Sequence, residues 1–160
     1  MKLDIKYGRK TIMSLETTLN EDLKTAMKAH DKLALNVIRM VKASLTNERV
    51  KVGHDLTADD ELTVLSREIK QRKESREEFA NADRQDLVDG LDKELAFLAK
   101  YAPKQLSEDE VKQIITDTVS EIGASSMADF GKVMGAVMPK LKGQADGALV
   151  NKTVKALLSK

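Results

Sequence analysis

Residues 131–139 read Gly-Lys-Val-Met-Gly-Ala-Val-Met-Pro, and residues 143–152 read Gly-Gln-Ala-Asp-Gly-Ala-Leu-Val-Asn-Lys. Apolar residues recur at helical spacing in both runs, and glycines mark the boundary between them, so the stretch predicts two helices joined by a turn. Gly131 and Gly135 are four residues apart and share one helix face. A glycine inside a helix costs about 1 kcal/mol relative to alanine. This face therefore predicts the close approach of another backbone, and on spacing alone a packed helix is favoured over a ligand.

The same helical period extends over the rest of the chain, and no segment alternates as a half-buried β-strand does. Before Pro103 a helix must end, because the residue ahead of a proline avoids the helical region; we take residues 103–106 as a linker. We therefore predict an all-α fold, with a multi-helical N-terminal body over residues 14–103 and a small three-helix tail over residues 107–160. Residues with capping potential mark the helix starts: Ser14, Asp31, Thr57, Ser107, Ser126 and Asp146.

The composition limits the possible chemistry. The chain has no cysteine, so disulfides and thiolate catalysis are excluded, and we expect a reducing, cytoplasmic location. No apolar run approaches the roughly 20 residues that cross a bilayer, so we expect no membrane partner. Residues 1–12 contain four basic residues but no following apolar segment, which argues against a signal peptide. We treat residues 1–13 as a leader or tag-like extension outside the fold.

Charge is unevenly distributed along the chain, although the net charge is only +1. Residues 13–123 hold 17 basic and 23 acidic residues, whereas residues 124–160 hold six lysines and two aspartates. An acidic body with a basic tail predicts that an anionic partner meets the tail. Lysines that serve only solubility are an equally good interpretation at this point.

Two groups of basic residues are candidate nucleic-acid contacts. On residues 67–76, the candidates are Arg72, Lys73 and Arg76, because guanidinium groups fit phosphate oxygens. Glutamates four residues from these cations favour the competing interpretation, a solvated face of i,i+4 ion pairs. The second group comprises tail lysines around the glycine turn: Lys132, Lys140, Lys142, Lys152 and Lys155.

The start of the last predicted helix adds a possible anion site, since a helix N-terminus presents free N–H groups. The competing interpretation assigns Gly143 and Gly147 only to the turn and Asp146 only to the helix cap.

No residues in the sequence predict catalysis. His30 and His54 are isolated and lack the spacing of metal ligands. The chain has neither a glycine-rich phosphate loop nor a nucleophile motif. We therefore predict no catalytic residue, no metal site and no cofactor.

Three motifs resemble the GatB/YqeY family, and the resemblance spans residues 14–158. The tail pattern G-K-V-M-G-x-V-M-P-x-L-K-G-x-A-D-G-x-x-V-N-x-x-V is similar to the tail of the B subunit of tRNA-dependent amidotransferases and to stand-alone YqeY proteins. The segments Ile69–Phe79 and Tyr101–Ser107 resemble matching parts of YqeY proteins, in the same order. Five residues that match the tail pattern are assigned to turns or close packing: Gly131, Gly135, Gly143, Gly147 and Asn151.

The resemblance implies a non-catalytic, tRNA-associated module. The family label is carbon–nitrogen ligase activity with glutamine as amido-N-donor, but this chain lacks the B subunit's catalytic cradle. The implied partners are tRNA and an amidotransferase or aminoacyl-tRNA synthetase.

The alternative is a protein–protein adaptor. In that case the glycine face and a methionine-bearing side (Met127, Met134 and Met138) bind a partner helix. Lysines that converge on one face favour nucleic acid, whereas an open apolar groove beside the glycines favours a protein.

Overall fold

The computed structural model describes residues 14–159, so the predicted leader, residues 1–13, lies outside the described range. Within that range the chain forms seven α-helices, one short 3-10 turn and no strand, which confirms the all-α prediction. The chain divides into two compact units, Met1–Ala102 and Pro103–Lys160. No helix in the described range is both long and apolar enough to cross a membrane.

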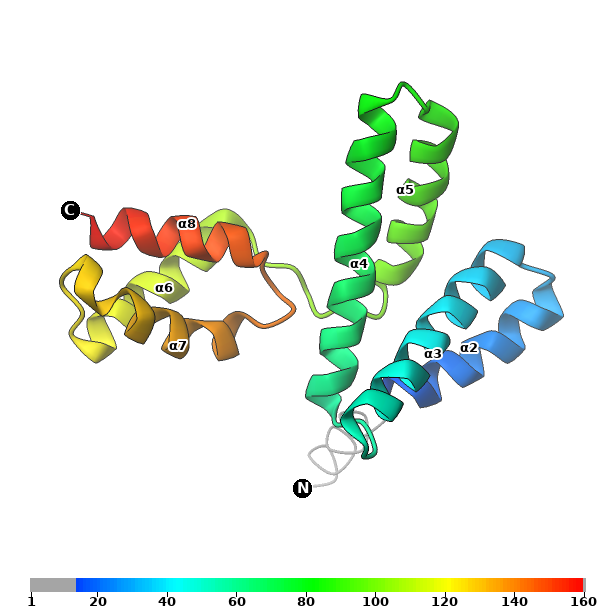
Figure 1. Cartoon of the computed structure of the whole chain (residues 1–160), viewed down its shortest axis with the longest axis horizontal. Helices are drawn as coiled ribbons and strands as arrows, with labels where there is room; N and C mark the ends of the chain where they lie inside the picture. Colours follow the sequence, from blue (N-terminus) through cyan, green and yellow to red (C-terminus); the bar gives the residue numbers. More distant parts are fainter. Residues whose placement is uncertain (1–13, 160) are drawn as a thin grey trace. The chain divides into compact units, whose positions relative to one another are not determined.

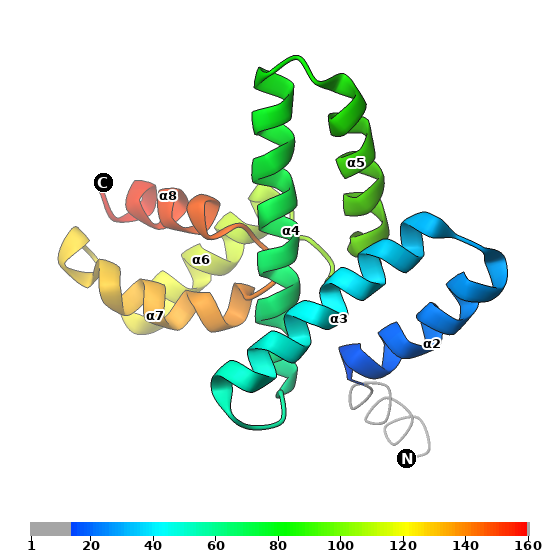
Figure 2. The ribbon, with the colours of Figure 1, turned by 45° about the vertical axis from the view of Figure 1, so that its right-hand side comes forward.

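The N-terminal unit is built from two helical hairpins (Figure 1). Helix α2 (Leu15–Ala29) lies beside α3 (Lys32–Val52), and α4 (Ala58–Asn81) lies beside α5 (Gln85–Ala99), in both views (Figures 1 and 2). Helix α3 also contacts both α4 and α5, so it joins the two hairpins.

The helix starts follow the predicted caps. The Ser14 side chain accepts from the Thr17 N–H at 3.1 Å, and the Asp31 side chain accepts from the Ala34 N–H at 3.0 Å. Thr57 forms a capping box at the start of α4. These side chains satisfy backbone N–H groups that have no partner inside the helix, which is why short polar residues start these helices.

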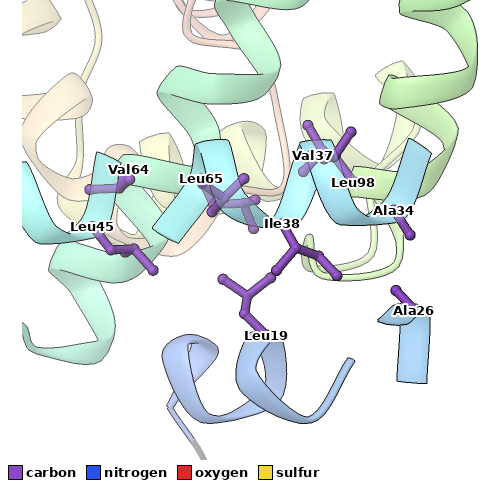
Figure 3. Packing of buried hydrophobic residues seen from close by; sticks show 10 residues of the cluster. Leu19, Ala26, Ala34, Val37, Ile38, Leu45, Val64, Leu65 and Leu98 are labelled. Carbon is purple, nitrogen blue, oxygen red and sulfur yellow. The ribbon is translucent and has the colours of Figure 1, made fainter. Parts of the chain in front are cut away.

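One apolar core holds the four helices together. Leu19 of α2, Ile38 of α3, Leu65 of α4 and Leu98 of α5 are at most 2% exposed. Figure 3 shows Leu19 and Ile38 pointing toward each other, with Leu98 close to Val37. Burial of these side chains supplies most of the driving force for this unit.

A buried ionic network crosses this unit beside the core. The Arg72 guanidinium donates from Nε to Glu94 Oε2 at 2.8 Å and from Nη1 to Glu68 Oε2 at 2.8 Å. Glu68 also accepts from Ser44 Oγ at 2.6 Å. The network connects α3, α4 and α5, and Arg72 is only 6% exposed.

Replacing Arg72 with methionine is expected to lower the free energy of unfolding by about 3–5 kcal/mol, because two carboxylates lose their buried partner. The measurement is urea denaturation followed by far-UV circular dichroism. Arg76→Met, which breaks the exposed ion pair with Asp92, is the matched control and should cost much less. Equal losses for the two variants would contradict the structural role of the network.

The end of α5 is fastened to α2 by a second polar contact. Tyr101 Oη donates to Asp22, and Lys100 Nζ lies 3.1 Å from Asp22 Oδ2. Burial and the hydrogen bond to Asp22 raise the pKa of Tyr101 well above its ordinary value. The hydrogen bond from Tyr101 lowers the pKa of Asp22 despite its partial burial. The neutral phenol and the ionised carboxylate are therefore both favoured in the folded state.

In a Tyr7→Phe background, where Tyr101 is the remaining tyrosine, tyrosinate absorbance should appear in the folded protein only well above the usual pKa of about 10. Asp22→Asn should move this ionisation part of the way back. Because the folded-state pKa is raised, stability should decrease as the pH rises above about 10. A spectrophotometric titration that gives the unfolded-state pKa in folded protein would refute the contact.

The C-terminal unit is a three-helix arrangement with a core of its own. Helix α6 (Glu108–Ile122) is followed by the 3-10 turn Met127–Asp129, helix α7 (Phe130–Leu141) and helix α8 (Gly147–Leu158) (Figures 1 and 2). The core is aliphatic and consists of Val111, Ile115, Val133, Val137, Leu141, Val150, Val154 and Leu158.

Two predicted caps behave differently in this unit. Ser107 forms the predicted capping box with Glu110. Ser126 forms a box with Asp129, but it precedes the 3-10 turn and not α7 itself. Before α6, the Leu106 N–H donates to the Gln144 carbonyl at 2.9 Å, which ties the segment entering the unit to the turn between α7 and α8.

Candidate nucleic-acid interface

A shallow hollow lies on one side of α8. Its lining comprises Gly147, Ala148, Asn151, Lys152 and Lys155. These positions occupy successive turns of one helix side, so the helical period brings them together. All of them are exposed except Asn151, which is half-buried. The lining combines two cations, one amide and two small residues, and it contains no acidic side chain.

The neighbouring residues position this lining. Val150 and Val154 fix the opposite side of α8 in the core, which leaves the two lysines at the surface. Lys155 Nζ lies 5.8 Å from the centre of the Phe130 ring, within the range of a cation–π contact. The ring belongs to the first turn of α7, so α7 helps to place one of the two ammonium groups.

The start of α8 carries an anion of its own. The Asp146 carboxylate accepts from the Ala148 N–H at 2.9 Å. A carboxylate therefore already lies where the sequence suggested a bound anion, and the cap interpretation of Asp146 holds. The hollow lies along the helix side that follows this cap.

The other tail lysines do not share this site. Lys140 Nζ donates to Thr118 Oγ1 at 3.1 Å and to Glu121 Oε2 at 2.9 Å, so its charge is directed toward α6. Lys132 is exposed near Asp129. Hydrogen bonds from the Ser125 and Ser126 N–H groups lower the pKa of Asp129, with a smaller contribution from Lys132. Lys142 is exposed directly after α7.

The basic segment of α4 is largely engaged in internal contacts. Arg72 is buried in the network described above, so the sequence prediction that it meets phosphate is corrected. Arg76 donates from Nη2 to Asp92 Oδ2 at 3.2 Å. Lys73 is exposed. The spacing suggested an i,i+4 ion pair with Glu77, but Lys73 forms no ion pair with that described residue. Ion pairing is therefore the better interpretation for Arg72, which is buried, and for Arg76, but not for Lys73.

The glycines of the tail fall into two groups. Gly143 has a φ of +74°, a conformation that glycine adopts without strain, so it serves the turn. Gly131 and Gly135 are exposed, and a Cβ at either position would meet no described atom within 4 Å. The expectation that another helix packs closely on this face is therefore wrong for the described residues. A Cβ at Gly147, in the hollow, also meets open space.

Gly135→Ala should raise the free energy of unfolding by about 0.5–1 kcal/mol, because alanine is the better helix former and the structure offers room for its methyl group. Gly143→Ala is the control and should be destabilising, because alanine resists a positive φ. Thermal and urea unfolding of the two variants test this. A destabilised Gly135→Ala protein would indicate that a neighbour contacts this face in the free chain.

Neither histidine forms a site. His30 ends α2 in the left-handed conformation, with a φ of 53°. His54 Nδ1 lies 2.8 Å from the Asp55 carbonyl oxygen. Across residues 14–159, no three His, Cys, Asp or Glu side chains are grouped so that they could hold a metal ion.

The chain is a small all-α protein of two helical units, and the second unit bears a face of lysines and small residues. It is related to the tail region of the tRNA-dependent amidotransferases. The chain belongs to the YqeY-like protein family, whose model matches residues 16–158.

Curated proteins of two kinds are similar to this chain. "Altered inheritance of mitochondria protein 41, mitochondrial" of Pyrenophora tritici-repentis is 33% identical over 144 residues, which cover 88% of this chain and 78% of that protein. The E subunit of glutamyl-tRNA(Gln) amidotransferase from Methanococcus maripaludis is 25% identical over 163 residues, which cover 98% of this chain but 25% of that protein. Its counterpart in Thermococcus gammatolerans is 44% identical over 54 residues, which cover 31% of this chain and 9% of that protein.

The expected cytoplasmic location is corrected by these relatives. The fungal proteins from Pyrenophora tritici-repentis, Clavispora lusitaniae and Kluyveromyces lactis are named as mitochondrial proteins. These names contradict the expectation of a cytoplasmic location. Cysteine content could not have decided the location, because a chain without cysteine is compatible with any redox compartment.

Proposed function

We propose that the chain is a tRNA-associated module that receives the RNA backbone on the α8 face. The observation that carries this proposal is the hollow itself, which Lys152 and Lys155 line together with Asn151 and two small residues. Lysine ammonium groups neutralise phosphates, and an asparagine amide donates to phosphate or sugar oxygens. Gly147 and Ala148 lack bulky side chains, so a sugar–phosphate backbone can approach the helix closely.

The charge around the hollow supports an anionic ligand. Helices α7 and α8 contain no acidic residue, and the exposed Lys132 and Lys142 add positive charge to the same unit. Asp146 is an acid next to the hollow, and its carboxylate is occupied by the cap. The net field of these two helices therefore attracts phosphate.

The ligand is proposed to be folded RNA and not an unstructured strand. Single strands are bound mainly by stacking on exposed aromatic side chains. Phe130 is half-buried, and Lys155 lies near its ring. Contacts from lysine and amide groups read the shape and backbone of a helical RNA. The amidotransferase proteins related to this chain are named for glutamyl-tRNA(Gln), which supports tRNA as the RNA.

The proposed module has no catalytic activity alone. It acts in trans, by holding tRNA for an amidotransferase or an aminoacyl-tRNA synthetase. The carbon–nitrogen ligase label of the family refers, on this proposal, to the larger subunits that carry a related tail.

A second candidate function is that of a protein adaptor. The specific observation in its favour is the outer face of α7, where Gly131 and Gly135 are open and Met138 is 42% exposed. Met127, in the 3-10 turn, is 44% exposed. Methionine surfaces of this kind adapt to a partner helix. If this chain fails to bind tRNA but binds a partner protein through the outer face of α7, the adaptor function is supported.

The double variant Lys152→Ala/Lys155→Ala tests the RNA-binding proposal. Fluorescence anisotropy of labelled bulk tRNA, measured over a salt series with the full chain, should show weaker binding for the variant. The salt dependence of its log affinity should fall by about 0.7–0.9 for each phosphate that the variant no longer neutralises.

The matched control is Lys93→Ala/Lys112→Ala, which removes two exposed lysines from acid-rich helices, α5 and α6. This control has the same net charge as the test variant. If both double variants show the same decrease in affinity, the effect reflects overall charge and the α8 face is not the docking site.

A further inference from the structure

The N-terminal unit carries a second surface without acidic residues. The two longest stretches of the sequence that lack Asp and Glu are residues 32–47 and 130–145. The second belongs to the tail described above, and the first forms most of α3. The other helices of the N-terminal unit are richer in acids, since α2, α4 and α5 each begin with at least one acid in the first turn.

Helix α3 begins against the helix dipole. Its first turn contains no acid, and its first residue is Lys32. A cation at a helix N-terminus is unfavourable, because the N-terminal end of the dipole is itself positive. The Asp31 carboxylate that caps α3 offsets part of this cost, and Lys32 stays exposed at the surface.

The outward side of α3 forms one continuous stripe. Val37, Ile38 and Leu45 point into the core in Figure 3, so the opposite side faces solvent. Six residues spaced alternately four and three apart share that side and are all exposed. This α3 stripe consists of Lys32, Asn36, Arg39, Ala43, Thr46 and Val50.

Arg39 is the exception among the arginines that the structure describes. The other five all form ion pairs with carboxylates, whereas Arg39 has none with a described residue. Three acids on or beside α3 already have partners: Asp31 caps the helix, Glu48 pairs with Arg67 at 3.0 Å, and Glu68 holds Arg72 at 2.8 Å. The guanidinium of Arg39 thus stays available to meet an anion.

We propose that the α3 stripe is a second RNA-backbone contact, separate from the α8 face. Lys32 and Arg39 are seven residues apart, about 10 Å along the helix axis, so they would meet different phosphates of one ligand. Asn36 and Thr46 add hydrogen-bonding groups for phosphate and sugar oxygens. Ala43, near the middle, lets the RNA backbone approach the helix.

The chemistry of the stripe favours RNA over an acidic protein. Its groups are cations, an amide, a hydroxyl and one small residue, with Val50 as the apolar end. Met40 is 52% exposed, but its sulfur lies 3.7 Å from Arg72 Nη2, on the flank toward α4 and not on the stripe. A protein interface would be expected to place such apolar side chains at its centre.

This inference takes its ligand from the proposed function but uses different residues. Two separate contacts on one chain make the second binding event intramolecular, so the removal of either contact should weaken binding markedly. Because the two contacts use different residues, each can be removed separately in the full chain.

The experiment measures the binding of labelled bulk tRNA by anisotropy over a salt series. The test variant is Lys32→Gln/Arg39→Gln, and the matched control is Lys93→Gln/Lys112→Gln, which removes two exposed cations from α5 and α6. We expect the test variant to bind about tenfold more weakly, with a salt slope reduced by about 0.7–0.9 for each phosphate left without its cation. The control should bind like the original chain. Circular dichroism and urea midpoints establish that both variants remain folded.

Each outcome decides between the two RNA contacts. If Lys32→Gln/Arg39→Gln binds like its control while Lys152→Ala/Lys155→Ala is weakened, the α3 contact is wrong and the α8 proposal stands. If only the α3 variant is weakened, the α8 proposal fails and this inference stands. A chain that binds no tRNA at low salt overturns both and leaves an acidic protein as the partner to seek for α3.

Discussion

The buried ion pairs of Arg72 constrain how α3, α4 and α5 pack in the N-terminal unit. A guanidinium at 6% exposure must have charged partners, because an unpaired buried charge is far too costly. Glu68 and Glu94 supply them from α4 and α5, and Ser44 of α3 holds Glu68 in place. Three helices are thereby fixed in register by one side chain. The same geometry removes Arg72 from any role at the surface.

The distribution of the remaining acids follows from a similar constraint. Carboxylates near α3 and α4 form internal pairs with arginines, and several acids in the first turns complement helix dipoles. Within residues 14–159, two surfaces then gather cations on one helix side, and the acid at the start of each helix, Asp146 or Asp31, is held in the helix cap. The α8 face holds two lysines, and the α3 stripe holds Lys32 and Arg39. An external anion can neutralise these cations where the described chain does not.

The fold was predictable from sequence because its determinants are local. Ser14, Asp31, Thr57 and Ser107 act as the caps that their side chains suggested, and the apolar period identified the core side of each helix. The site was less predictable because it depends on contacts distant in sequence. Lys140 meets Thr118 and Glu121 of another helix, and Arg72 meets Glu94, so neither is available as predicted. Glycine spacing alone indicated a packed face at Gly135, yet that face is open.

A long acid-free run was visible in the sequence, and it is the signal that could have identified α3. The structure was needed to interpret this run. Only the contacts show that Arg39 has no carboxylate partner among the described residues, whereas each of the other described arginines has one. Two residues at the surface are not the most stabilising choices for their helices. Gly135 lowers the stability of α7 relative to alanine, and Lys32 opposes the dipole of α3, although the Asp31 carboxylate at the cap offsets part of that effect. Natural proteins commonly keep such suboptimal residues, so the feature that marks α3 is the guanidinium of Arg39, which has no carboxylate partner among the described residues.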